Sequence, residues 1–391
     1  MSLQILHLVG PLDPSKGGPP NSVTRLAAAQ ALLGHRVGLA TPVIPGLPTA
    51  DVLRILDPIP GFRKLELFFF DPGFANVLGF PRKDPGFPAT SVLHIHGCWE
   101  PYLVGGARWA SNRQIPYCFA PHGMLDRWSM AQSHWKKRLA LALGWRGVLD
   151  RGSFIHVLNG DEAEGAQPLR LKPPFEVIPN GVFPAEFSGF RPAEAFRERY
   201  PQLGARPYVL FLSRLHHKKG LDLLAAAFSR VAQEMPEVML VVVGPDEGAR
   251  ADFERRIADY GLANRTLLTG PLYGEDKLYA MLDAAVFCLP SRQEGFSVAI
   301  LEALQLGVPL VITNECHFPE VGEFGAGLIT SLRPSDIADA LITMLRDKEG
   351  SVAMGQKGRQ MVSDKFVWQE IAVRAIAAYK HRCGIDLKIE N

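Results

Sequence analysis

Short apolar runs alternate along this chain with longer segments in which apolar residues recur every three or four positions. The runs are bounded by glycine, proline or polar residues, which is typical of strands buried in a parallel sheet, and the longer segments are typical of amphipathic helices. This alternation predicts βαβ units and an α/β fold of doubly wound sheets. The predicted strands are residues 3–9, 36–41, 91–96, 116–120, 153–158, 176–178, 208–212, 238–243, 266–269, 284–289 and 310–313.

The chain is long for a single hydrophobic core. Its 391 residues predict two domains. Residues 184–207 are polar and contain several prolines, which is typical of a domain boundary. We therefore expect domains at residues 1–185 and 186–364, followed by a last amphipathic helix within residues 365–391. Residues 42–90 give no clear periodicity, so the sequence predicts no element there.

Charge divides unevenly although the net charge is only +2. Residues 1–185 hold 18 lysines and arginines against 13 aspartates and glutamates, a balance of +5. Residues 186–391 hold 24 against 27, a balance of −3. The small basic surplus fits an anionic partner such as a phospholipid surface or a diphosphate-linked acceptor, and it also fits an ordinary solvated surface. We expect no nucleic-acid partner.

The five cysteines include no close pair, which argues against a disulfide framework and a zinc site. Cys118 and Cys288 lie in apolar runs and are predicted to be buried. Residues 3–10 lack a basic flank and are too short for a signal peptide, and no apolar run approaches the roughly 18 residues of a membrane span. We therefore expect a cytosolic protein.

Residues 290–307 carry the chain's most informative pattern: a strand end, a turn and a helix. Pro290 ends the apolar run, Ser297 is a predicted N-cap, and Gly307 is a predicted helix end. The first amides of the helix, at Gly295, Phe296 and Ser297, suit an anion. A glycine there also lets the backbone approach a ligand closely.

Two carboxylates flank this helix start. Glu294 lies in the loop and Glu302 on the helix, where each can accept hydrogen bonds from paired hydroxyl groups. A phosphate between two polyols fits the pattern, and a nucleotide sugar is such a molecule. On spacing alone, two glutamates in an amphipathic helix also occur by chance.

Two further loops also directly follow predicted strands. Arg214 and Lys219 lie five residues apart after the strand 208–212, as a basic loop that would be unremarkable by itself. Gly17 and Gly18 follow the first strand, where a glycine pair either forms a turn or lets the backbone approach a phosphate.

Histidines also stand at predicted strand ends, where ligands bind in doubly wound sheets. His94 and His96 close one strand, and His122 follows another in the sequence Pro-His-Gly. Each fits either a hydrogen-bonded loop residue or a catalytic one. His96 and Glu100 are candidate acceptor contacts.

The segment from Arg127 to Arg146 mixes basic residues with tryptophans, and residues 134–146 are predicted to form one helix. Such a mixture favours a membrane interface, and it is equally compatible with a helix whose leucines face a core. The basic and aromatic residues are Arg127, Trp128, Trp135, Lys136, Lys137, Arg138, Trp145 and Arg146.

The order of strand, Pro-Ser, Glu-Gly-Phe-Ser, Leu-Glu-Ala and Gly-Val-Pro resembles the Glu-x7-Glu element of the family-four glycosyltransferases. The resemblance implies the GT-B fold, in which two Rossmann-like domains face each other across a cleft and a C-terminal helix crosses back to the first. Two positions depart from the family pattern: Ser213 stands where glycine is usual, and Phe183 where aspartate often follows Pro-Asn-Gly-Val.

The resemblance also implies roles for individual residues. Catalytic roles fall to His122, which would face the donor sugar and leaving phosphate, and to Arg214, Lys219 and Glu294. Donor binding falls to a larger set, in which Glu294 holds sugar hydroxyls, Glu302 the ribose and Leu272 the base: Gly17, Gly18, Arg214, Lys219, Leu272, Glu294, Gly295, Phe296, Ser297 and Glu302.

The expected function is transfer of a sugar, with retention of configuration, from a UDP- or GDP-linked donor to a saccharide or lipid-linked acceptor in polysaccharide biosynthesis. We expect no cofactor and no metal, because the chain contains no Asp-x-Asp sequence and Asp161, Glu162 and Glu164 are interpreted as acidic residues at a helix start. An anionic membrane surface is a further expected partner. The alternatives are a nucleotide-sugar epimerase of the same fold and a non-catalytic paralogue in a glycan-assembly complex.

Overall fold

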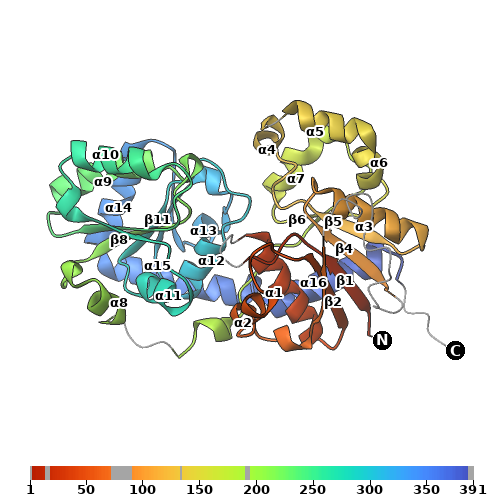
Figure 1. Ribbon diagram of the computed structural model, residues 1–391. Coiled ribbons are helices and arrows are strands. Elements are labelled where there is room, and N and C mark those ends of the chain that lie inside the picture. The colour runs from red at the N-terminus through yellow and green to blue at the C-terminus, as the bar shows by residue number, and fades with distance from the viewer. Residues whose placement is uncertain (1, 14–17, 72–89, 133, 190–193, 386–391) are drawn as a thin grey trace. The chain divides into compact units, whose positions relative to one another are not determined.

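A computed structural model describes residues 2–13, 18–71, 90–132, 134–189 and 194–385. The chain forms two compact units (Figure 1). Unit 1 comprises Met1–Phe183 together with Val367–Asn391, and unit 2 comprises Pro184–Phe366. The expected domain limits differ from these boundaries by two residues at each crossing.

Unit 1 is built on a seven-stranded parallel sheet with the order β3-β2-β1-β4-β5-β6-β7. The order reverses between β1 and β4, which makes this pair the topological switch point of a doubly wound sheet. The strands are β1 Gln4–Leu8, β2 Arg36–Pro42, β3 Glu66–Phe70, β4 Val92–His96, β5 Tyr117–Ala120, β6 Ile155–Val157 and β7 Phe175–Val177. The helices are α1 Pro19–Leu32, α2 Thr49–Leu56, α3 Pro101–Asn112, α4 Arg127–Ala131, α5 His134–Ala140, α6 Arg146–Leu149, α7 Gly160–Ala166 and α16 Trp368–Arg382.

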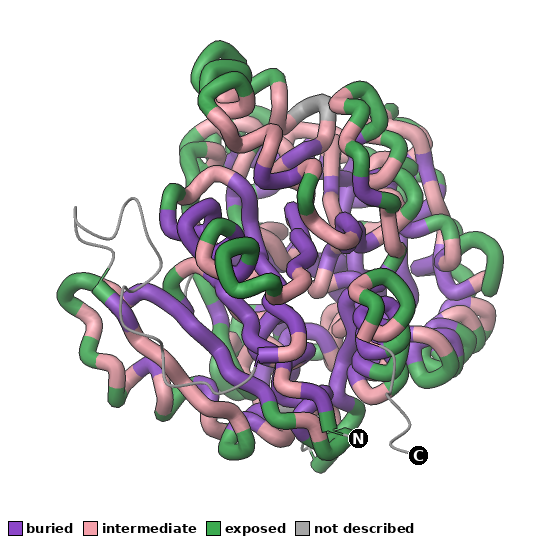
Figure 2. Tube along the Cα trace, turned by 90° about the vertical axis from the view of Figure 1, so that its right-hand side faces the viewer, coloured by how far each residue is buried: buried purple, intermediate pink, exposed green. Residues whose placement is uncertain are grey.

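Both faces of this sheet are covered, because its strands are apolar at successive positions. Ile5 of β1 packs into one core with α1 and α16, and the next residue, Leu6, packs into the opposite core with α3. Successive side chains of a strand point to opposite faces, so a continuous apolar run requires helices on both sides. Figure 2 shows the resulting buried strands in purple beneath exposed segments in green.

Unit 2 repeats the design with a six-stranded parallel sheet of order β10-β9-β8-β11-β12-β13. Its switch point lies between β8 and β11. The strands are β8 Tyr208–Leu212, β9 Met239–Val243, β10 Thr266–Gly270, β11 Val286–Leu289, β12 Leu310–Thr313 and β13 Gly327–Thr330. The helices are α8 Glu194–Arg199, α9 Leu221–Glu234, α10 Arg250–Asp259, α11 Gly274–Leu282, α12 Val298–Gln305, α13 Glu320–Glu323, α14 Pro334–Arg346 and α15 Lys348–Lys365.

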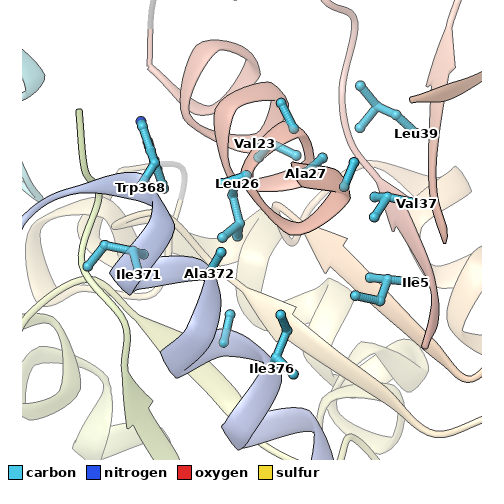
Figure 3. Packing of buried hydrophobic residues seen from close by; sticks show 14 of the residues in the cluster. Ile5, Val23, Leu26, Ala27, Val37, Leu39, Trp368, Ile371, Ala372 and Ile376 are labelled. Atoms are coloured by element: carbon cyan, nitrogen blue, oxygen red, sulfur yellow. The ribbon is translucent and has the colours of Figure 1, made fainter. Parts of the chain in front are cut away.

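The last helix of the chain completes unit 1. Trp368 N donates to Val182 O at 3.0 Å, which joins the two crossings of the chain. Figure 3 shows Leu26 of α1 directed at Ala372 of α16, within a core that also contains Ile5. The helix α16 is therefore a structural part of the first sheet's helical layer.

The structure corrects several expectations from the sequence. Helix α1 begins at Pro19, because proline is well tolerated in the first helical turn. Within the segment 42–90, where no element was predicted, α2 and β3 form, and residues 72–89 lie outside the described part. Strand β13 was also missed.

Candidate functional site

Two loops of unit 2 interlock at its switch point. One connects β8 to α9 and the other connects β11 to α12. Arg292 N donates to Lys218 O at 2.6 Å, and the Ser291 hydroxyl donates to the same carbonyl at 3.1 Å. Gly220 has a φ of 70°, and a Cβ at that position would lie 1.9 Å from Pro290 O. Only glycine fits this close approach of the two backbones.

The interlocked loops bring Lys219 and Glu294 together. Lys219 Nζ lies 2.6 Å from Glu294 Oε1, and the two side chains are only 11% and 8% exposed. The backbone of Glu294 is fixed as well, since its N–H donates to Glu315 O at 2.9 Å. A charge pair this deeply buried must hold its geometry, because separating the partners leaves an uncompensated charge.

Arg214 is held far less firmly. Its guanidinium forms an ion pair with Glu247 at 2.8 Å, with side chains that are 52% and 38% exposed. Exposed pairs of this kind contribute about 1 kcal/mol or less, so the guanidinium is available to exchange its partner for another anion.

The start of α12 is shaped as the sequence predicts. The Ser297 hydroxyl accepts a hydrogen bond from Ile300 N at 3.4 Å, as an N-cap does. The ring of Phe296 packs against Phe318, with ring centroids 5.3 Å apart, and against Phe366 at 6.0 Å. This packing fixes the backbone of the turn that contains Gly295, so the peptide groups at the helix start are held in place.

Glu302 also has a cationic partner. Lys277 Nζ of α11 lies 2.6 Å from Glu302 Oε1, with both side chains largely buried. Lys277 was not predicted from the sequence, because a lysine on a separate helix gives no local signal of this contact. Leu272, the expected base contact, follows β10 and is 8% exposed.

In unit 1, the described part of the glycine-rich loop contains Gly18, which precedes α1 with a φ of 61°. Gly17 lies outside the described residues. A positive φ is unfavourable for residues with a Cβ, so a glycine is required at this turn. The backbone therefore enters α1 without a side chain covering the helix start.

His122 occupies a constrained loop after β5. Its φ of 51° is left-handed, which is uncommon for a residue other than glycine. The carboxylate of Glu162 accepts hydrogen bonds from Gly123 N and, at 2.7 Å, from Leu158 N. Burial raises the pKa of Glu162 to about 7. Glu162, which was interpreted only as an acidic residue at the start of α7, thus holds the histidine loop in place.

A cluster of histidines fills the carboxyl ends of the central strands of unit 1. Burial lowers the pKa of His7 and His156 to about 4 and that of His122 to about 3. Burial also holds the pKa values of His94 and His96 well below the usual range. His7 and His156 were not predicted as members of the cluster, although each is a histidine within an apolar run, which is the sequence signal for a buried histidine.

Three of these rings are close enough to be considered as metal ligands: His7, His94 and His96 have nitrogen atoms within 4.8 Å of one another. However, His7 Nδ1 and His96 Nε2 are 2.8 Å apart, a hydrogen-bond distance. Two nitrogens bound to one tetrahedral zinc ion would be about 3.3 Å apart, since each Zn–N bond is about 2.0–2.1 Å. The arrangement is better explained by hydrogen bonding between neutral imidazoles.

His96 is also not an acceptor contact. The residue is 3% exposed, and its ring nitrogens bond to His7 at 2.8 Å and to His122 at 3.1 Å. No ring nitrogen of His96 is left for a substrate. Glu100, the other candidate, precedes α3 and is half-buried.

The basic segment predicted as one helix is interrupted. After α5 ends, a π-helical segment, Leu141–Trp145, contains a break at Leu143 and Gly144, where the φ of Gly144 is 111°. The prediction of one continuous helix is therefore wrong, since a left-handed residue cannot continue a right-handed helix.

Some side chains of this segment bond to other residues of unit 1. Trp145 Nε1 donates to Cys98 O at 2.9 Å, and Lys137 Nζ donates to Ser129 O at 2.6 Å. Arg146 forms an ion pair with a neighbouring aspartate at 3.0 Å. These three residues are consequently engaged with unit 1 itself.

Other side chains of the segment form an exposed apolar stripe. Trp135, Leu139 and Leu143 are 66%, 51% and 68% exposed and are spaced four residues apart. Trp135 and Leu139 lie within α5, so their spacing places them on one side of that helix, and Leu143 follows at the break after it. Lys136 and Arg138 beside the stripe are also exposed, whereas the side chains of residues 127 and 128 are outside the described part. Within the described residues, every helix is too short or too polar to pass through a bilayer.

Two family models match the chain and together span most of it. Residues 17–181, in unit 1, match the model described as "Glycosyl transferase 4-like domain". Residues 193–361, in unit 2, match the model described as "Glycosyl transferases group 1".

Curated relatives of the chain include mannosyltransferases. A GDP-mannose-dependent alpha-(1-6)-phosphatidylinositol monomannoside mannosyltransferase of Mycobacterium tuberculosis is 33% identical over 213 residues, which cover 51% of this chain and 54% of the relative. The match thus spans about half the length of that relative. A phosphatidyl-myo-inositol mannosyltransferase of Mycolicibacterium smegmatis is 27% identical over 384 residues, 96% of this chain and 92% of the relative.

Solved structures share the fold over nearly the whole chain. Sucrose-phosphate synthase from Thermosynechococcus elongatus has a TM-score of 0.73 at 20% identity, covering 98% of this chain and 100% of that one. The Anabaena HepE protein in complex with UDP and glucose has a TM-score of 0.74 at 18% identity, covering 97% and 100%.

Proposed function

The chain belongs to the family-four glycosyltransferases of the GT-B fold, and on that basis we propose that it transfers a hexosyl group from a nucleoside diphosphate sugar to a saccharide or lipid-linked acceptor. The bond between the sugar's anomeric carbon and the diphosphate breaks, and the acceptor oxygen forms a new bond to that carbon. The acceptor hydroxyl loses its proton, and the nucleoside diphosphate leaves.

The observation that carries the proposal is the buried contact between Lys219 and Glu294 at the switch point of unit 2. Ligands of doubly wound sheets bind at that point. A fixed cation suits a diphosphate, and a fixed carboxylate suits the hydroxyl groups of a sugar. The two charged groups lie 2.6 Å apart, so a single ligand that contains both a diphosphate and sugar hydroxyls can contact both of them.

Charge neutralisation of the departing diphosphate is the proposed catalytic device. Lys219, Arg214 and the amides at the start of α12 would stabilise the negative charge that develops as the bond breaks. Every 1.4 kcal/mol or so of such stabilisation accelerates the step about tenfold. In many other enzymes that use nucleotide sugars, a divalent ion neutralises this charge. Because these groups neutralise it here, the reaction is proposed to be independent of metal.

The remaining residues are proposed to bind the donor. Glu294 accepts hydrogen bonds from the sugar hydroxyls, Glu302 from the ribose, and the backbone near Leu272 contacts the base of a UDP- or GDP-linked donor. The side chain of His122 faces the donor sugar. Glu294 holds the sugar and forms no covalent intermediate in this proposal. Retention of configuration then requires the acceptor oxygen to bond to the anomeric carbon on the same face from which the diphosphate leaves.

We propose an anionic membrane surface as the place where the acceptor is reached. The stripe formed by Trp135, Leu139 and Leu143 would enter the headgroup region, with Lys136 and Arg138 near the lipid phosphates. The names of the two mannosyltransferase relatives refer to phosphatidylinositol-based acceptors, which supports a lipid-linked acceptor.

The test is a transfer assay with labelled UDP- and GDP-sugars and a membrane lipid extract, with and without a chelator. We expect label in a lipid or saccharide product, unaffected by the chelator. Strict dependence on added magnesium or manganese would reject metal independence. Conversion of the donor without an acceptor would indicate an epimerase, and a lack of turnover with every donor would indicate a non-catalytic paralogue.

A further inference from the structure

We propose that a buried chain of hydrogen bonds, running from the carbonyl of Ile178 to His122, fixes His122 as the tautomer that carries its proton on Nε2. His122 then presents the lone pair of Nδ1 as a hydrogen-bond acceptor. The tautomer is argued from the structure alone, and the use of Nδ1 toward the donor rests on the proposed function. The chain links, in order, Ile178, His156, His94, Tyr379, Gln30, His7, His96 and His122.

The direction of the chain is set at its first bond. A backbone carbonyl can only accept, so His156 Nε2, at 2.6 Å from Ile178 O, carries a proton. In a neutral imidazole the other nitrogen is then an acceptor. His94 Nε2, at 3.2 Å from His156 Nδ1, must therefore donate, which leaves His94 Nδ1 as an acceptor.

The next two bonds determine the orientation of an amide. His94 Nδ1 accepts from the hydroxyl of Tyr379 at 2.7 Å, and this uses the only proton of that hydroxyl. Tyr379 Oη must then accept from Gln30 Nε2 at 3.1 Å. The amide oxygen of Gln30 consequently faces His7 Nε2 at 2.7 Å, and His7 Nε2 must donate to it.

The last two hydrogen bonds of the chain lead to the loop of His122. His7 Nδ1 accepts from His96 Nε2 at 2.8 Å, and His96 Nδ1 accepts from His122 Nε2 at 3.1 Å. His122 Nδ1 remains as the free end, without a hydrogen bond to any described residue. Each of the five histidines in this hydrogen-bond chain is therefore the Nε2–H tautomer.

The hydrogen-bond chain has this direction only when its imidazole rings are neutral, and their burial keeps them neutral. Burial lowers the pKa of all five histidines, to about 4 for His7 and His156, to about 3 for His122, and well below the usual range for His94 and His96. A cation at one position would reverse the tautomers of the rings that follow it. The fixed direction therefore depends on neutral rings.

The fixed tautomer restricts what His122 can contact. A phosphate oxygen only accepts hydrogen bonds, so it gains nothing from the lone pair of Nδ1, whereas a sugar hydroxyl can donate to that lone pair. The chain thus assigns His122 to a hydroxyl of the donor sugar and not to the leaving phosphate. Gln30 of α1 and Tyr379 of α16 are positioning residues that act through it.

The direct test is NMR of the full-length protein labelled with ¹⁵N in its 11 histidines. We expect protonated Nε2 and unprotonated Nδ1 at the five network positions, and ¹⁵N–¹⁵N couplings across the bond between His96 and His122. The resonance of His122 is identified by its loss in His122→Gln. A proton on Nδ1 of His122 in the unsubstituted protein would overturn the inference.

A substitution tests the link through the last helix. Tyr379→Phe removes the acceptor that orients Gln30, so its amide can turn and donate to His7. His7, His96 and His122 should then show the second tautomer together, whereas His94 and His156 should keep theirs. The matched control is Tyr117→Phe, which removes another buried hydroxyl of unit 1 that donates to a backbone carbonyl, at 2.8 Å, and should change no tautomer.

An unchanged His122 in folded Tyr379→Phe would reject the coupling. If that variant does not fold, the couplings in the unsubstituted protein decide the question. In the transfer assay, equal populations of the two tautomers should lower kcat/KM about twofold, because only one population is competent. A lack of transfer with every donor would reject the proposed function and leave the tautomers unaffected, so the two failures are distinguishable.

Discussion

Lys219 and Glu294 lie 75 residues apart in sequence, and their side chains meet at 2.6 Å inside unit 2. The pair makes the same two residues responsible for the stability of the unit and for the proposed chemistry. The effect of a substitution at either residue must therefore be measured both on the stability of unit 2 and on turnover.

The six tryptophans of the chain all lie in unit 1. Tryptophan fluorescence therefore reports the unfolding of unit 1, and circular dichroism also reports that of unit 2.

Lys219→Ala should abolish most turnover and destabilise unit 2. The substitution leaves Glu294 buried without a partner, which costs about 3–5 kcal/mol. The double variant Lys219→Ala with Glu294→Ala should recover part of that stability and none of the turnover. Urea unfolding by circular dichroism and kcat at saturating donor are the measurements. Normal turnover of the single variant at saturating donor would show that its charge does not stabilise the leaving group.

Glu294→Gln should keep part of the turnover and change the preference among donor sugars. The amide retains an oxygen for Lys219 and for a sugar hydroxyl, but it loses the negative charge. The measurement compares kcat/KM for several labelled donors. Trapping of a glycosyl group on Glu294 in the unsubstituted enzyme would contradict its assignment as a sugar-binding residue.

Gly220→Ala should remove donor binding by forcing the two loops apart. A Cβ there would lie 1.9 Å from Pro290 O, and the φ is 70°. Gly248→Ala is the control, because Gly248 has a φ of 93° and no atom within 4 Å of an added Cβ. Both substitutions cost roughly 1–2 kcal/mol for the left-handed backbone, and only the first adds a clash. Donor affinity should fall in Gly220→Ala alone, and equal effects of the two would reject the interlocking role.

Unit 1 should lose stability in acid. The five network histidines have folded pKa values below 6.5, with His7 and His156 at about 4 and His122 at about 3, so below pH 6.5 the unfolded chain binds protons that unit 1 does not. Each such proton lowers the free energy of unfolding by about 1.4 kcal/mol per pH unit. Their contribution is fully present above pH 6.5 and is lost as the pH falls toward 4.

Glu162 acts in the opposite direction. Its pKa is raised from 4.5 to about 7, so its contribution is lost as the pH rises through that range, but it is one group against five. Tryptophan fluorescence during urea unfolding between pH 7.5 and 4.5 measures the net effect. A stability of unit 1 that stays constant over this range would show that the folded and unfolded states take up the same number of protons, which would contradict the lowered pKa values of the network histidines.

Membrane binding should depend on the exposed stripe. Replacing Trp135, Leu139 and Leu143 with serine should abolish co-sedimentation with anionic vesicles, and added salt should weaken binding of the unsubstituted protein. The control is Val373→Ser, which removes an apolar side chain that is 49% exposed on α16. Binding that survives the triple substitution, or that is absent at low salt, would leave the acceptor to be sought in solution.

Much of the fold was predictable because its signals are local. Strands β8 and β12 coincide with the predicted residues 208–212 and 310–313, since each is a short apolar run ended by a turn residue. Edge strand β3 escaped prediction because most of its side chains are only half-buried and show neither pattern. The break at Gly144 was missed because an isolated glycine is tolerated in a helix.

The candidate site was predictable only in part for a different reason. Motif residues such as Glu294 and Lys219 stand in recognisable loops, and the structure brings these two together. Contacts between residues far apart in sequence have no local signal. The sequence around Lys277 does not indicate its partner Glu302, and the sequence around Gln30 does not indicate Tyr379, 349 residues later. Such pairs are defined by the folded topology alone.

The return of the chain to unit 1 has a consequence for its synthesis. Unit 2 is inserted within the sequence of unit 1, so α16 leaves the ribosome only after all of Pro184–Phe366 has been made. At about 5–20 residues per second, that insertion delays completion of unit 1 by roughly 10–40 s. During this interval the face of α1 that α16 covers is exposed, and Gln30 lacks Tyr379. The nascent chain should therefore recruit chaperones to its first half until translation ends.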